Sequence, residues 1–178
     1  MTPQRQRRLF VAAVLFQILI LIAVPAQKMN TLLFGRTIFL QVSPVDPYSI
    51  MSGYYVTLSY DIQRLEKISS EGERLERENC RDFYVTVEER PDGVWKAIAA
   101  ERQNPGKRPE NQAILHGNIQ RWGRPSFGIE EFYIPEERRR EISEDLQKNR
   151  NKARVEVRVD DAGNAVLVSL RIEDRVYR

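Results

Sequence analysis

The feature that most constrains this chain is an apolar run near its start. From Leu9 to Gln27 the sequence contains no charged residue, and Gln17 is the only polar residue in the stretch LFVAAVLFQILILIAV. A helix from Leu9 through Ala26 has 18 residues and a length of about 27 Å, just enough to cross the hydrocarbon core of a bilayer. A helix on the surface of a soluble domain needs a polar stripe, which this run lacks. We therefore expect residues 9–26 to contact the lipid bilayer as a single span.

The charges beside this run predict its orientation. Arg5, Arg7 and Arg8 precede it, and residues 1–30 contain no acidic side chain. Cationic flanks of a membrane span are retained in the cytoplasm. We therefore expect a single-pass protein with a cytoplasmic N-terminus and an extracytoplasmic, periplasmic C-terminal domain.

Two interpretations of the N-terminal segment remain open. One is an uncleaved signal anchor, residues 1–27, followed by a domain of residues 28–178; Pro25 suits the end of such a helix because proline disrupts helices. The other is a cleaved secretory signal, with Val24-Pro25-Ala26 as the cleavage site. Both place the folded domain outside the cytoplasm.

The charge balance argues against a nucleic-acid partner. The whole chain has 28 basic and 25 acidic residues, a formal net charge of +3. Four of the basic residues lie in residues 1–30, so residues 31–178 contain 24 basic and 25 acidic side chains. A nucleic-acid-binding domain concentrates basic charge on its folded part, and this domain does not.

Short runs of β-branched, aromatic and aliphatic residues predict a β-rich domain. In several of them the apolar residues alternate, as in Val155, Val157 and Val159, which indicates strands that are buried on one side. The predicted strands are Thr37–Val42, Tyr54–Ile62, Phe83–Glu89, Val94–Ala100, Ala113–Arg121, Ile129–Ile134, Ala153–Val159 and Ala165–Ile172. We expect an α+β fold, in which one N-terminal transmembrane helix precedes an antiparallel, sheet-like or barrel-like domain with one or two helices.

Turn and helix signals complete this expectation. Pro91-Asp92-Gly93 and the segment Asp160–Asn164 each favour a hairpin. Pro135–Arg150 is typical of a helix, with a narrow apolar face of Ile142 and Leu146. Gln63–Asn79 is either helix or loop, and Ser69-Ser70-Glu71-Gly72 at its centre favours an interruption.

The sequence offers few residues for catalysis or metal binding. His116 is the only histidine and Cys80 the only cysteine, so neither a histidine cluster nor an intramolecular disulfide can form. No glycine-rich phosphate-binding motif is present. We expect no cofactor, no metal and no catalytic residue, with His116 as an ordinary strand residue.

The densest unusual stretch is VSPVDPYSIMSGYYVTLSY, residues 42–60. Its prolines fix the backbone, and Gly53 allows a turn just before a strand. Along that strand the even-numbered residues 54–60 share one face, so its tyrosines lie on both faces. The pattern suggests either a rigid turn leading into a core strand or a strand with one face turned toward a partner.

This stretch resembles the motif that names the GDYXXLXY family of bacterial membrane-anchored proteins. Gly53, Tyr55, Leu58 and Tyr60 match the motif, whereas Tyr54 stands where the pattern has aspartate. The lead-in Asp46, Pro47 and Tyr48, the stretch from Phe132 to Glu136, the N-terminal anchor and the final valine-rich hairpin are also similar to the family. The resemblance implies no activity, but it implies a setting beside multi-span membrane proteins and hence a membrane partner.

Three functions follow as hypotheses. The first is an anchored extracytoplasmic domain that binds or stabilises a multi-span membrane protein. The second is a membrane-bound hydrolase or peptidase, in which Ser43, Ser49 or Ser52 is paired with a buried amine of Lys96 or Lys107. The third is a module that binds a small ligand or an envelope polymer through exposed tyrosines, namely Tyr48, Tyr54, Tyr55 and Tyr60.

Overall fold

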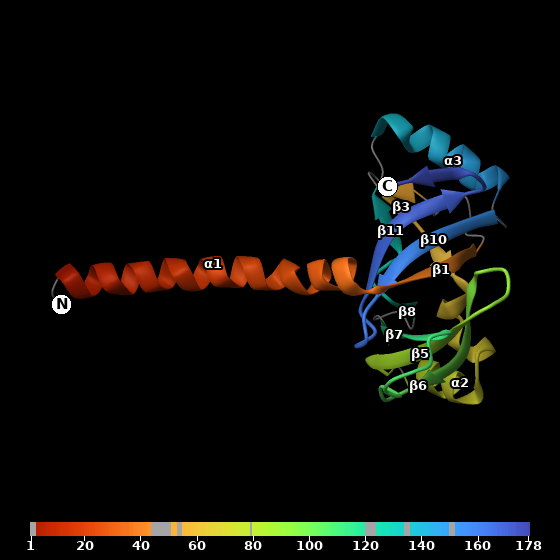
Figure 1. Ribbon diagram of the computed structural model, residues 1–178, viewed down its shortest axis with the longest axis horizontal. Helices are drawn as coiled ribbons and strands as arrows, with labels where there is room; N and C mark the ends of the chain where they lie inside the picture. Colours follow the sequence, from red (N-terminus) through yellow and green to blue (C-terminus); the bar gives the residue numbers. More distant parts are fainter. Residues whose placement is uncertain are drawn as a thin grey trace.

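A computed structural model describes residues 3–43, 51–52, 55–78, 80–119, 124–133, 136–149 and 152–178. It confirms the α+β class, with one long N-terminal helix and a β-rich domain (Figure 1). The helices are α1 (Pro3–Phe34), α2 (Ser70–Arg77) and α3 (Arg139–Lys148). The strands are β1 (Arg36–Ser43), β2 (Met51–Ser52), β3 (Tyr55–Thr57), β4 (Ser59–Tyr60), β5 (Asp82–Glu89), β6 (Trp95–Glu101), β7 (Gln112–Ile119), β8 (Pro125–Ser126), β9 (Glu131–Tyr133), β10 (Ala153–Val159), β11 (Ala165–Ile172) and β12 (Arg175–Tyr177).

Helix α1 projects away from the β-rich domain over most of its length (Figure 1). Its segment Leu9–Phe34 has 26 residues, and the most apolar stretch within that segment has a mean hydropathy of 2.7 and is not buried inside the protein. The helix is long and apolar enough to cross a membrane. The expected end at Ala26 is wrong, because the helix continues through Pro25 to Phe34. A proline removes one backbone donor, and here that loss does not end the helix.

Most strands join one large sheet, in which nine strands lie within the described residues. Its order is β12-β11-β10-β1-β6-β5-β7-β8, and β4 pairs with the end of β1. Neighbouring strands are antiparallel except β1 and β6, which are parallel and meet at Leu40 and Trp95. The expected sheet-like arrangement is confirmed, but the large sheet is mixed because of this one parallel pair, and in the described part of the chain it is open rather than barrel-like. A second, three-stranded sheet has the order β2-β3-β9.

The alternating valines pack as their spacing predicts. Val155, Val157 and Val159 on β10 are buried, while the charged residues between them are only half-buried. Both predicted hairpins are present. Gly93 and Gly163 have positive φ angles of 74° and 89°, which suit glycine in tight turns.

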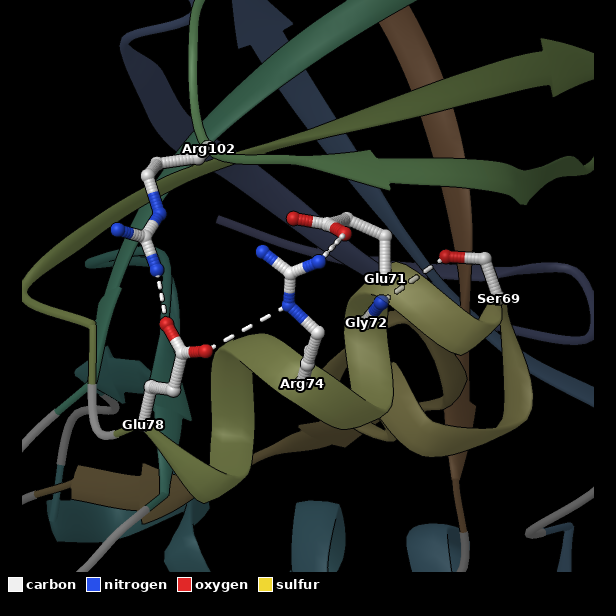
Figure 2. Close-up of polar contacts among 6 residues, drawn as sticks. All are labelled: Ser69, Glu71, Gly72, Arg74, Glu78 and Arg102. Carbon is white, nitrogen blue, oxygen red and sulfur yellow. Dashed lines mark hydrogen bonds and ion pairs between the residues drawn. The ribbon is translucent and has the colours of Figure 1, made fainter.

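Helix α2 begins where the sequence suggested a break. The Ser69 hydroxyl accepts a hydrogen bond of 3.0 Å from the Gly72 amide, which caps the helix. Figure 2 shows this cap and the ion pairs of Arg74 with Glu71 and Glu78; Glu78 also binds Arg102, next to the end of β6. The extended Ser69 separates the 3₁₀ turn Leu65–Lys67 from α2, so the predicted interruption is present and lies at the start of α2.

The C-terminal residues attach α3 to the sheet. The Tyr177 hydroxyl donates a hydrogen bond of 2.5 Å to Asp145, and Arg175 contacts the same carboxylate at 2.7 Å. Ile142 and Leu146 are buried, as the helical spacing predicted. Strand β12, which contains Tyr177, was absent from the predicted elements.

The end of α1 is joined to the turn between β10 and β11. Thr31 is fully buried, and its hydroxyl donates a hydrogen bond of 2.7 Å to the Asp160 carboxylate. The Gly35 amide donates to the Thr31 carbonyl, and Arg158 donates to the Gly35 carbonyl at 2.7 Å. Burial opposes ionisation of Asp160, but hydrogen bonds from Asn164 and Thr31 outweigh it and hold the pKa of Asp160 below its usual value. We call Thr31, Gly35, Arg158, Asp160 and Asn164 the helix clasp.

The predicted strand Tyr54–Ile62 is broken in the structure. Residues 55–57 pair with β9, residues 59–60 pair with β1, and Leu58 lies between them. A 3₁₀ turn follows at Asp61–Gln63. The chain thus changes partners at Leu58, which explains why one alternating pattern forms two strands.

Gly117 on β7 offers a test of the core. A Cβ atom at this position would lie 2.4 Å from the Phe83 ring and 3.0 Å from the Phe127 ring. These two rings pack edge to face with centroids 5.5 Å apart. We expect Gly117→Ala to lower the free energy of unfolding by about 1–3 kcal/mol through overpacking. Chemical denaturation measures this, and a Phe83→Leu background should reduce the loss; an equal loss in both backgrounds would contradict it.

Candidate functional site

The motif residues divide into two groups. Asp46, Pro47, Tyr48 and Gly53 lie outside the described residues. Tyr55, Leu58 and Tyr60 are described, and all three contact one segment, residues 129–133, which lies about seventy positions further along the chain. The structure therefore brings the motif strand together with β9 and the residues just before it.

Leu58 and Tyr60 belong to the core. They are 2% and 1% exposed. The Leu58 amide donates a hydrogen bond of 2.7 Å to the Glu130 carbonyl, and the Tyr60 hydroxyl donates one of 2.6 Å to the Ile129 carbonyl. Burial, followed by the Glu130 carboxylate, raises the pKa of Tyr60 well above its usual value. These two motif residues fasten the strand to the segment before β9.

Two polar side chains that the sequence analysis missed complete this attachment. The Gln63 side-chain oxygen accepts from the Tyr60 amide at 2.9 Å, and its nitrogen donates to the Pro125 carbonyl at 3.1 Å. The Glu130 carboxylate accepts from the Phe127 amide and the Ser126 hydroxyl, at 2.6 and 3.0 Å. Gly128, with φ of 74°, forms the turn within this loop. In the sequence, these hydrogen bonds are indicated only by local features: Gln63 lies three residues after Tyr60, and Gly128 lies two residues before Glu130.

Tyr55 is the described motif residue with a partly exposed side chain. It pairs with Tyr133 across β3 and β9, and their ring centroids are 6.0 Å apart. Tyr133 is 68% exposed. Tyrosine rings offer a large apolar area with a polar tip, and they are enriched at protein interfaces. We call Tyr55 and Tyr133 the tyrosine pair.

The described residues of the serine–lysine hypothesis do not form a serine hydroxyl paired with a buried lysine amine. The Ser43 hydroxyl donates a hydrogen bond to the Asp61 carboxylate. Lys96 and Lys107 are exposed, so neither provides a buried amine. Ser49 and the side chain of Ser52 lie outside what the structure describes.

The remaining chemically interesting residues have structural partners. His116 lies in β7, as predicted; its imidazole is 3.2 Å from Asp82 and stacks on Tyr84. Cys80 is a free, half-buried cysteine that packs against the core. Among the described residues no group of three or more histidine, cysteine or acidic side chains is arranged to hold a metal ion. Tyr60 is buried and therefore unavailable to an external ligand, whereas Tyr48 and Tyr54 are not described.

Tyr60→Phe should destabilise the domain at neutral pH. The substitution leaves the buried Ile129 carbonyl without its donor, which we expect to cost about 1–3 kcal/mol. The folded-state pKa of Tyr60 is raised, so its contribution is complete below the pKa of an unfolded tyrosine, about 10, and is lost as the pH rises above it. The stability difference between wild type and Tyr60→Phe should therefore shrink above pH 10.

Denaturation curves at neutral and alkaline pH measure both effects. Tyr177→Phe is the matched control, because burial, followed by the hydrogen bond with Asp145, also raises the pKa of Tyr177. Because the Tyr60→Phe variant still contains Tyr177, we expect it to lose some stability at alkaline pH, but less than the wild type loses. A stability difference that stays constant from neutral to alkaline pH would contradict the assignment.

Comparisons with known proteins agree with the motif. The family model of the GDYXXLXY protein matches residues 17–170, a region that includes the motif strand, β9 and the helix clasp. No curated protein and no solved structure matches the chain. Since the family model covers most of the 178 residues, this chain belongs to the GDYXXLXY family.

Proposed function

We propose that this protein is a single-pass membrane protein whose extracytoplasmic domain binds and stabilises a multi-span membrane partner. The observation that carries the proposal is the 26-residue segment Leu9–Phe34 of α1, whose most apolar stretch is not buried inside the protein. Exposed apolar area of this extent needs a lipid or protein covering. Arg5, Arg7 and Arg8 at the other end favour a cytoplasmic N-terminus.

The length of α1 favours an uncleaved anchor over a secretory signal. The helix is continuous through the suggested cleavage site at Ala26. Cleavage there would leave Met29, Leu33 and Phe34 exposed to water at the start of the mature domain, where they are 50%, 62% and 81% exposed. An uncleaved helix keeps these side chains at the membrane boundary, next to the lipid headgroups.

The tyrosine pair is the surface that we propose for the partner. It is held by the motif strand, whose Leu58 and Tyr60 are fixed in the core. A rigidly supported pair of tyrosines loses little conformational entropy on binding. The family setting beside multi-span membrane proteins, implied by the motif, favours an integral membrane protein as the partner.

The anchor has a direct test. After expression in bacteria, the intact chain should stay in the membrane pellet through alkaline carbonate extraction, with the full mass of 20.8 kDa. Protease added from the periplasmic side should digest the domain, and Arg5, Arg7 and Arg8 changed together to Gln should lower the digested fraction. Recovery of the full-length chain from the soluble cytosol would refute the anchor.

The partner surface is tested by co-purification in mild detergent. We expect a multi-span protein to co-purify with the wild type and its yield to fall about tenfold or more with Tyr133→Ser, because interface tyrosines contribute strongly to affinity. Ile98→Ser is the matched control, because Ile98 is an exposed apolar residue on β6, away from the pair. A wild type that purifies alone as a monomer, or equal losses with both variants, would count against the proposal.

A further inference from the structure

The domain lies close to the place where α1 would leave the bilayer. About 20 helical residues cross a hydrocarbon core, so a span beginning at Leu9 reaches the far boundary near Lys28. Beyond Lys28 the helix continues only to Phe34, and β1 begins at Arg36. The chain therefore leaves no linker between the helix and the sheet. The side of the domain that carries the helix clasp must lie within the headgroup layer, if the anchor proposed above is correct.

A pocket opens at this level. Its volume is about 280 Å³, and it lies between the last turns of α1 and the strands β7, β8 and β11. Gln27, Lys28 and Thr31 line it from the helix, and Asn118 and Ser126 line it from the sheet. Lys28 and several polar residues are among the lining residues, and none of the lining residues is acidic. The nearby Asp160 carboxylate accepts hydrogen bonds from two of them, Thr31 and Asn164.

A second pocket beside the clasp differs in its charges. It has a volume of about 260 Å³ and is lined by the cationic Arg36, Lys107 and Arg108. The carboxylates of Asp160 and Asp161 also line it, and they repel an anion. Of these two pockets, only the first has a cationic residue and no acidic residue among its lining residues. There the Asp160 carboxylate is occupied by hydrogen bonds from Thr31 and Asn164.

We propose that the Lys28 pocket binds the phosphate of an anionic lipid headgroup. The proposal rests on the membrane anchoring proposed above, because that anchoring brings the pocket to the headgroups. Lys28 supplies a positive charge, and the amides of Gln27 and Asn118 supply hydrogen-bond donors for phosphate oxygens. The volume is near the lower end of small-ligand sites, which suits a headgroup rather than a large cofactor.

The test uses the full chain in nanodiscs of phosphatidylcholine with a minority of phosphatidylglycerol. Native mass spectrometry then counts the phosphatidylglycerol molecules that stay bound after transfer to detergent. We expect the wild type to retain one, and Lys28→Gln to weaken retention about tenfold, the effect of losing a charged hydrogen bond. Asn118→Tyr, which fills the pocket without changing its charge, should weaken it similarly.

Lys107→Gln is the matched control, since it removes the same charge from the second pocket and should leave retention unchanged. Lys28, Lys107 and Asn118 are all exposed, and thermal denaturation checks that each variant folds.

Equal effects of Lys28→Gln and Lys107→Gln, with none of Asn118→Tyr, would show nonspecific attraction and overturn the proposal. Inorganic phosphate is added in a separate arm, and displacement of the lipid by phosphate at similar concentrations would assign the pocket to the free anion instead. A chain that fails to enter nanodiscs would refute the anchor, whereas a chain that enters without retaining phosphatidylglycerol would refute only the headgroup site.

Discussion

The hydrogen bond from Thr31 to Asp160 fixes the direction in which the apolar helix leaves the sheet. Thr31 is fully buried although most of α1 is exposed. The Asp160 carboxylate accepts a hydrogen bond from the Thr31 hydroxyl and another from the Asn164 side-chain amide. Gly35 is required beside it, because a Cβ there would lie 2.3 Å from the Thr31 carbonyl oxygen. Because α1 and the sheet are joined in this way, the direction of the helix relative to the sheet is fixed. Every proposal about which face of the domain approaches a membrane or a partner depends on this connection.

The family motif has two physical roles in this fold. Leu58 and Tyr60 are core residues that fasten one strand to the segment before β9, whereas Tyr55 carries a partly exposed ring beside Tyr133. The first role stabilises the fold, and the second supplies the contact surface that we propose for a partner. Rigid support for the exposed ring comes from the buried residues of the same eight-residue stretch. Tyr54, which replaces the aspartate of the pattern, lies outside the described residues.

Local sequence patterns predicted much of the fold. The apolar run predicted α1, the alternating valines predicted β10, and the pair Ile142 and Leu146 predicted the buried face of α3. In each case the periodicity of burial is visible within one short segment. The Asp-Gly turn likewise needed only local information, because positive φ angles favour glycine.

The errors occurred where distant parts of the chain decide the structure. The helix passes Pro25 and ends only where Thr31 meets Asp160, about 130 residues away in sequence. The strand around Leu58 breaks because its two halves pair with β9 and β1, and neither pairing is visible in the alternation. Gln63 and Glu130 form hydrogen bonds around the motif strand, yet each looks like an ordinary polar residue in the sequence.

The two ends of the large sheet affect how copies of this protein behave when crowded. One end is β12, with three residues, and the other is β8, with two described residues that include Pro125. Proline has no amide hydrogen to donate, and Arg175 on β12 contacts Asp145 of α3. Because both edge strands are short and partly blocked, they offer a neighbouring molecule few free backbone N–H and C=O groups for adding a strand to the sheet. Molecules confined to a two-dimensional layer, as we propose for this one, meet repeatedly in similar orientations, and such borders protect them from edge-to-edge polymerisation.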